Sequence, residues 1–281
     1  MAFWRRLLEG TSWQTLVTYV SPAFFQLVST RDVSRTAYQL VRNWFDEERY
    51  ARAILLRAST LAKLDSGLSV SKVQRRRGER LPFRSERPEA GEIDANCRTG
   101  EKALILFFHQ IYVDGPVFLD LRRNHFQCVA GSPGPSHVFN ASPLYCDWTA
   151  EFRAAMRQLY SGFYGDTEPG TYQSALQSLG IEVVADIFDR AFGGERKRAA
   201  RFMLSDFRVT FHEVFTRCLE AKAALHPDFL TLGIAIATLY DHLELDGGVY
   251  DVAACYARAM NGEGRDLVAP NSADGSLPPA V

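Results

Sequence analysis

The chain lacks the local signatures of most enzyme classes. Its 281 residues contain no HExxH metal motif, no GxSxG nucleophile elbow, no GxGxxG turn and no Walker phosphate loop. The five cysteines form no CxxC pair and show no metal-ligand spacing, so we expect all five to be reduced thiols in a reducing compartment. No residue set points to catalysis, and we predict a non-enzymatic protein without a cofactor.

An excess of positive or negative charge is also absent, since 32 Lys and Arg residues face 33 Asp and Glu residues. The net charge is −1, which gives the whole molecule no electrostatic attraction to nucleic acid. The first ten residues carry charge and no small-residue cleavage site follows them, so no signal peptide is expected. The sequence therefore predicts a cytoplasmic protein.

Strand signals are few, and helical periodicity accounts for most of the chain. The longest apolar run, Asp228 to Leu243, has apolar residues at helical spacing on one face and small residues on the other. It is too short to span a bilayer. We predict an all-α fold, a multi-helix bundle in which this segment is the buried central helix near the C-terminus.

The other segments with helical spacing surround this central helix in our prediction. They comprise residues 32–66 as one helix or two, and then 101–113, 117–125, 148–160, 172–192 with a break at Gly180, 196–222 and 249–260. Residues 1–262 should form one helical domain. We expect 72–100 and 128–147 to be surface loops, and 263–281 to be a disordered tail.

Two alternative functions follow from clusters of polar residues. His212, Asp241, His242 and Glu244 could converge as the ligands of an α-helical metalloenzyme, although histidines hydrogen-bonded at helix ends explain the same pattern. Residues 3–8 and the arginines between 75 and 87 could contact an anionic membrane surface, which would make the chain a peripheral lipid-binding protein. A helix that docks on the core and a solvated basic loop are the simpler interpretations.

Three segments, taken in order, support a more specific hypothesis. They read FLDLRR at 118–123, FYGDTEP at 163–169 and LYDHL at 239–243, with Gly247 following. Together they resemble the CYRI family and the related N-terminal domain of CYFIP proteins. Position 2 is Ala, where CYRI members have a Gly that can be acylated, and the 129–146 insert is unlike the family.

The resemblance implies an all-helical module that binds a GTP-loaded Rac-type small GTPase and regulates WAVE-dependent actin assembly. It also implies that Arg122 and Arg123, as exposed charges, meet the acidic switch surface of the GTPase. Arginine suits such a role because it pairs with carboxylates in a bidentate way and is enriched at interfaces. Two arginines on an ordinary solvated helix are the alternative reading of this pair.

Overall fold

The computed structural model describes residues 23–64, 66–73, 97–129, 136–165, 168 and 170–260. Helices dominate this part of the chain, as predicted. They are α3 (Phe24–Leu27), α4 (Thr30–Phe45), α5 (Glu47–Leu61), α6 (Gly100–Tyr112), α7 (Ala150–Tyr164), α8 (Thr171–Leu179), α9 (Ala185–Phe192), α10 (Leu204–Glu220), α11 (Phe229–Asp246) and α12 (Val252–Met260). The segment predicted as one helix or two is two, because Asp46 ends α4 and its side chain accepts a hydrogen bond from Arg49 N at the start of α5.

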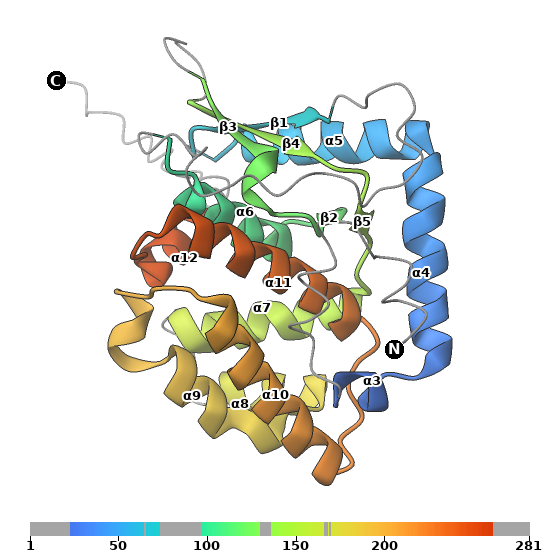
Figure 1. The fold of residues 1–281 in the computed structure, drawn as a ribbon, viewed down its shortest axis with the longest axis vertical. Helices are drawn as coiled ribbons and strands as arrows, with labels where there is room; N and C mark the ends of the chain where they lie inside the picture. The colour runs from blue at the N-terminus through green and yellow to red at the C-terminus, as the bar shows by residue number, and fades with distance from the viewer. Residues whose placement is uncertain are drawn as a thin grey trace, which may run out of the picture.

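The all-α prediction is confirmed in part: the fold is mostly helical, but the described residues also form two small sheets. The strands are β1 (Leu68–Lys72), β2 (Val117–Phe118), β3 (Phe126–Cys128), β4 (His137–Ala141) and β5 (Tyr145–Cys146). β4 lies between β1, which runs parallel to it, and β3, which runs antiparallel, while β2 pairs with β5. Figure 1 shows α5 and the three-stranded sheet on one side of α6, and α7 to α10 on the other.

The expected surface loop at 128–147 therefore contains ordered core structure. Phe139, Tyr145 and Cys146 are buried, and Phe126 packs on Phe139 across the β3–β4 pair. Its Gly, Pro and Ser residues suggested a loop, but the short strands between them obtain their hydrogen bonds from distant segments. The expected loop at 72–100 is described only at its two ends, where β1 finishes and α6 begins. The predicted tail at 263–281 lies outside the described residues.

The helix predicted at 117–125 is also replaced by extended chain and a single 3-10 turn, Arg123–His125. Its backbone donors find partners far away in sequence: Leu119 N donates to Leu144 O, and Leu121 N donates to the Thr238 hydroxyl. Since every residue from Val117 to Arg123 is buried, this segment is an interior strand-like connection. A continuous buried run has no solvent-facing side, and its periodicity therefore does not distinguish helix from extended chain.

Two helices form the interior of the molecule. Of the thirteen residues of α6, eleven are buried, compared with ten of the eighteen in α11. The predicted central helix thus exists and lies against α6, but α6 is the more completely enclosed of the two. Helix α6 also contacts α7 and α12, which places it at the junction of the sheet side and the helical side (Figure 1).

Candidate functional site

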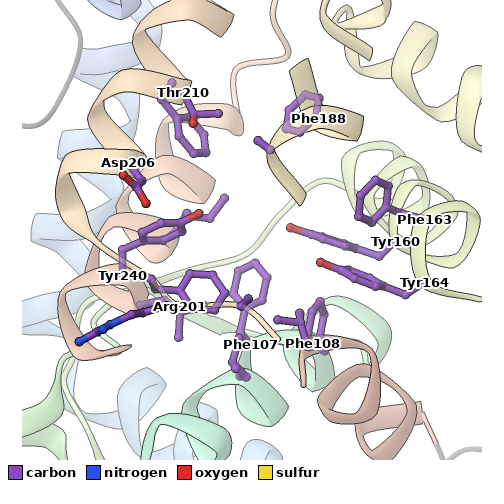
Figure 2. Close-up of a pocket in the computed structure, with 18 of the residues that line it drawn as sticks. Phe107, Phe108, Tyr160, Phe163, Tyr164, Phe188, Arg201, Asp206, Thr210 and Tyr240 are labelled. Carbon is purple, nitrogen blue, oxygen red and sulfur yellow. The ribbon is translucent and has the colours of Figure 1, made fainter. Parts of the chain in front are cut away.

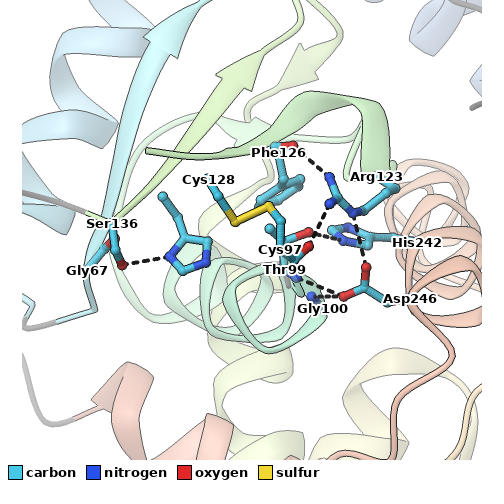
Figure 3. The surroundings of a disulfide bond; sticks show 11 residues. Gly67, Cys97, Thr99, Gly100, Arg123, Phe126, Cys128, Ser136, His242 and Asp246 are labelled. Carbon is cyan, nitrogen blue, oxygen red and sulfur yellow. Dashed lines mark hydrogen bonds and ion pairs between the residues drawn. A yellow bond between two sulfur atoms is a disulfide. The ribbon is translucent and has the colours of Figure 1, made fainter. Parts of the chain in front are cut away.

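Four of the polar residues singled out in the sequence, Arg122, Arg123, Asp241 and His242, are buried, and Figure 3 shows part of their surroundings. His212 is exposed on α10, and Glu244 is half-buried. Arg122 and Arg123 are 4% and 8% exposed, so the expectation of two exposed arginines is wrong. Arg122 forms two hydrogen bonds to the Asp120 carboxylate, from Nε at 2.7 Å and from Nη2 at 2.6 Å. Burial alone would raise the pKa of Asp120, but Arg122 and His125 hold it well below its ordinary value.

Arg123 joins the two interior helices. Its Nε donates to Asp246 Oδ1 at 3.0 Å, and its two Nη atoms donate to the carbonyls of Phe126 and Cys97. The other oxygen of Asp246 accepts from the backbone N–H groups of Thr99 and Gly100 at 2.8 and 2.6 Å. Since α6 has no capping side chain of its own, Asp246 from the end of α11 supplies the cap.

The candidate metal ligands do not form a metal site. His242 is fully buried, with Nδ1 2.8 Å from Leu121 O and Nε2 2.8 Å from the Thr99 hydroxyl. Burial, together with the charge of Arg123, lowers the pKa of His242 to about 4, so the ring is neutral and uses both nitrogens in hydrogen bonds. Among the residues that the structure describes, no group of three or more His, Cys, Asp or Glu side chains is arranged to hold a metal ion.

A disulfide adjoins this cluster and corrects the expectation of five free thiols. Cys97 and Cys128 are bonded across 31 residues of sequence, with Cα atoms 5.7 Å apart (Figure 3). The bond ties the chain entering α6 to the end of β3. Cys146, Cys218 and Cys255 are free and buried. Spacing could not reveal the pair, because the two cysteines meet only through the tertiary fold.

The membrane-contact candidates cannot be placed. Residues 3–8 and the arginines between 75 and 87 lie outside the described residues. Within the described part, none of the helices combines the length and the apolar character needed to cross a bilayer.

A different site, which sequence reasoning missed, lies on the helical side of the molecule. A pocket of about 450 Å³ opens between α6, α7, α10 and α11, in the size range of about 300–1,000 Å³ that is usual for small-molecule sites. Helix α6 contributes Leu104, Phe107 and Phe108, and α7 contributes Tyr160, Phe163 and Tyr164 (Figure 2). The sequence did not reveal the pocket, because aromatic residues at helical spacing are also typical of a helix face packed in the core.

The aromatic wall of the pocket is held by ring packing. The Phe108 ring meets the rings of Tyr160 and Tyr164 nearly edge-on, with centroids 5.4 and 5.7 Å away. Helix α8 lies so close to α7 that a side chain at Gly162 would come within 2.8 Å of the Tyr172 backbone. This close approach fixes Tyr172, another lining residue, beside the wall.

Most of the polar groups in the pocket are uncharged. Figure 2 shows the hydroxyl groups of Tyr160 and Tyr164 pointing into the cavity. Burial raises the pKa of both tyrosines well above the ordinary value, so both hydroxyls keep their protons. The charged lining residues Arg201 and Asp206 are both exposed and carry opposite charges, which leaves the rim neutral.

The rim comes from the segment between α9 and α10. Helix α10 was expected to begin at Arg196 and begins at Leu204, because the preceding residues form a short 3-10 turn and an extended stretch. Ala200 exchanges two backbone hydrogen bonds with Tyr250, at 2.9 and 2.8 Å. This bridge holds Ala199, Ala200, Arg201, Phe202 and Met203 at the pocket instead of in the helix.

No protein-family model, curated protein or solved structure matches this chain. The similarity to the CYRI and CYFIP proteins, and the Rac-type GTPase as a partner, therefore stay predictions. Because Arg122 and Arg123 are enclosed and ion-paired, a GTPase would have to bind another surface. Changing both to Asp would bring carboxylates against Asp120 and Asp246, so lost binding could not be separated from lost folding.

Proposed function

We propose that this chain is a non-enzymatic binding protein for a small, uncharged and largely apolar molecule, which occupies the pocket between α6, α7, α10 and α11. The observation that carries the proposal is a cavity of about 450 Å³ walled by aromatic rings. An apolar cavity of this size lowers the stability of the fold, because the side chains that line it lack the dispersion contacts that a packed neighbour would give them. A ligand would restore those contacts.

The chemistry of the lining selects the ligand. Transfer of a charged group into an aromatic cavity costs several kcal/mol unless an opposite charge meets it. Arg201 and Asp206 are the charged lining residues, and both stand at the exposed rim. The interior therefore favours neutral molecules with flat or ring-shaped apolar parts, which stack on aromatic side chains.

The proposal is tested with N-phenyl-1-naphthylamine, an uncharged aromatic probe whose fluorescence rises in an apolar environment. Titration into the purified full chain should give saturable binding. Thr210→Trp should weaken binding roughly tenfold or more, because Thr210 lines the pocket and the larger ring fills it. Figure 2 shows Thr210 beside the cavity.

The matched control is Val209→Trp. Val209 is the preceding residue on the same helix and is 67% exposed, so the new ring enters solvent and probe affinity should stay within about twofold of wild type. Circular dichroism confirms that both variants fold. Absence of saturable binding to the wild-type chain, or equal binding by the Thr210→Trp protein, would contradict the proposal.

GTPase binding is a second candidate, supported by the order of the three sequence segments on a mostly helical chain. Retention of the chain by Rac loaded with a GTP analogue, and not by Rac loaded with GDP, would support it.

A further inference from the structure

We propose that Tyr160 and Tyr164 jointly bind one carbonyl oxygen of the pocket's ligand, so that the ligand class is a flat, uncharged ring ketone. This inference rests on the proposed function, since it assumes that the pocket holds a small molecule. It adds which atom of the ligand is recognised, and by which atoms of the protein.

The first step is the arrangement of the two rings. Tyr160 and Tyr164 lie one turn apart on α7, with ring planes 7° from parallel and centroids 6.2 Å apart. Figure 2 shows their C–O bonds pointing the same way, into the cavity. The two hydroxyl oxygens are therefore separated by about the same distance as the centroids. An oxygen atom midway between them would lie about 3 Å from each, which is the length of a hydrogen bond.

The second step is that both hydroxyls are available. Neither Tyr160 nor Tyr164 has a hydrogen-bond partner for its hydroxyl among the residues that the structure describes, whereas Tyr112 on α6 donates to Arg157 O at 2.8 Å. A hydroxyl that faces a pocket without a partner in the protein is open to a ligand that supplies one. Two such groups side by side indicate a site and not a packing defect.

The third step concerns the chemistry of the partner. Both tyrosines are protonated, and each hydroxyl can rotate its O–H group toward an acceptor placed between the two rings, so they can act as two donors. A carbonyl oxygen has two lone pairs and accepts two hydrogen bonds in the plane of its substituents. A carboxylate would also accept them, but among the described lining residues the cation is Arg201 at the exposed rim, and the nearby Lys197 ammonium already donates to Phe163 O.

The fourth step is preorganisation. Phe108 meets both tyrosine rings, and the Tyr256 ring lies 5.6 Å from the Tyr164 ring. The two side chains are thus fixed before the ligand arrives, so little rotamer entropy is lost when it binds. The remaining rings of the wall are free to stack on the apolar part of the ligand.

The experiment compares two molecules of the same shape, 9-fluorenone and fluorene, which differ only in the replacement of a carbonyl by a methylene group. Equilibrium dialysis against the full chain should show that the ketone binds roughly 5- to 100-fold more tightly, as expected for two neutral hydrogen bonds. Tyr160→Phe and Tyr164→Phe should each weaken ketone binding roughly 2- to 10-fold, and the double variant should remove the preference.

The control variant is Tyr38→Phe, which makes the same chemical change at a tyrosine that is 69% exposed on α4. It should leave both affinities unchanged, and fluorene should bind all variants within about twofold of wild type. Equal binding of ketone and hydrocarbon by the wild-type chain, or a preference that survives in the double variant, overturns the inference and leaves the proposed function standing. Binding of neither molecule overturns both.

Discussion

Helix α6 borders two buried regions that use polar groups in opposite ways. At its first residues, Asp246 pairs with Arg123 and caps the helix, and His242 bonds Leu121 O and the Thr99 hydroxyl. Half a helix further on, Phe107 and Phe108 face a cavity in which the hydroxyls of Tyr160 and Tyr164 have no partner among the described residues. The first region has the composition expected of an active site and is fully paired within the protein. The second has the composition of a hydrophobic core and leaves its polar groups available.

This comparison is the reason that we propose the ligand site from unused hydrogen-bonding capacity and not from residue type. Arginine, aspartate and histidine together suggest chemistry, but in this chain they join α6 to α11. Tyrosine and phenylalanine suggest packing, but in this chain they surround an open volume. The predictions that follow treat the polar cluster as structural and the pocket hydroxyls as functional.

The largest effect is expected from Asp120→Ala. The change leaves Arg122 and His125 buried without the carboxylate that contacts both. Loss of one partner from a buried ion pair costs about 3–5 kcal/mol, and we expect the lower end because Asp241 also acts on Arg122. Denaturant unfolding followed by circular dichroism measures the loss.

Asp206→Ala is the matched control for that variant, because Asp206 is exposed at the rim of the pocket. Its free energy of unfolding should stay within about 0.5 kcal/mol of wild type. Equal losses of unfolding free energy in the two variants would contradict the view that the polar cluster, and not the pocket rim, stabilises the fold.

A comparable effect for each buried histidine is expected from acidification. The pKa of His242 is lowered from 6.5 to about 4 in the folded protein. Below pH 6.5 this histidine therefore binds a proton in the unfolded chain while it stays neutral in the folded chain. The contribution of the neutral His242 to the free energy of unfolding is fully present above pH 6.5 and is lost as the pH falls toward about 4. The loss amounts to roughly 3 kcal/mol for this residue. His109, whose pKa burial lowers to about 3, adds a second loss over an overlapping range.

The measurement is the free energy of unfolding at a series of pH values between 7 and 4. His242→Gln should reduce the slope, and His212→Gln should not, because His212 is an exposed residue of α10. A slope that the His242 substitution leaves unchanged would show that this ring is not the group responsible.

The smallest effect is expected from Tyr172→Phe. The Tyr172 hydroxyl is buried and has no hydrogen-bond partner within the described part of the chain, so its removal should leave the free energy of unfolding unchanged or raise it by up to about 1 kcal/mol. Tyr112→Phe is the comparison, since the Tyr112 hydroxyl donates to Arg157 O, and its loss should cost about 1 kcal/mol. Thermal melts of the two variants decide the point, and equal destabilisation would assign Tyr172 a structural hydrogen bond.

The sequence by itself determined those elements whose apolar residues repeat at helical spacing and whose ends are set locally. Helices α6, α7 and α11 follow their predicted segments closely, and the break at Gly180 is real because this residue has a positive φ of 72°. Amphipathic periodicity is a property of the segment alone, so it is readable without knowledge of neighbours.

Only the tertiary structure decided what depends on a partner far away in the chain. The segment from Val117 to Arg123 is extended because Leu144 and Thr238 meet its backbone donors, and Arg123 is paired inside the protein because Asp246 reaches it from the end of α11. The Cys97–Cys128 bond and the pocket have the same origin, since each requires elements separated by many residues to converge. A residue's type fixes what it can bind, but its neighbours in space decide whether that capacity is already used.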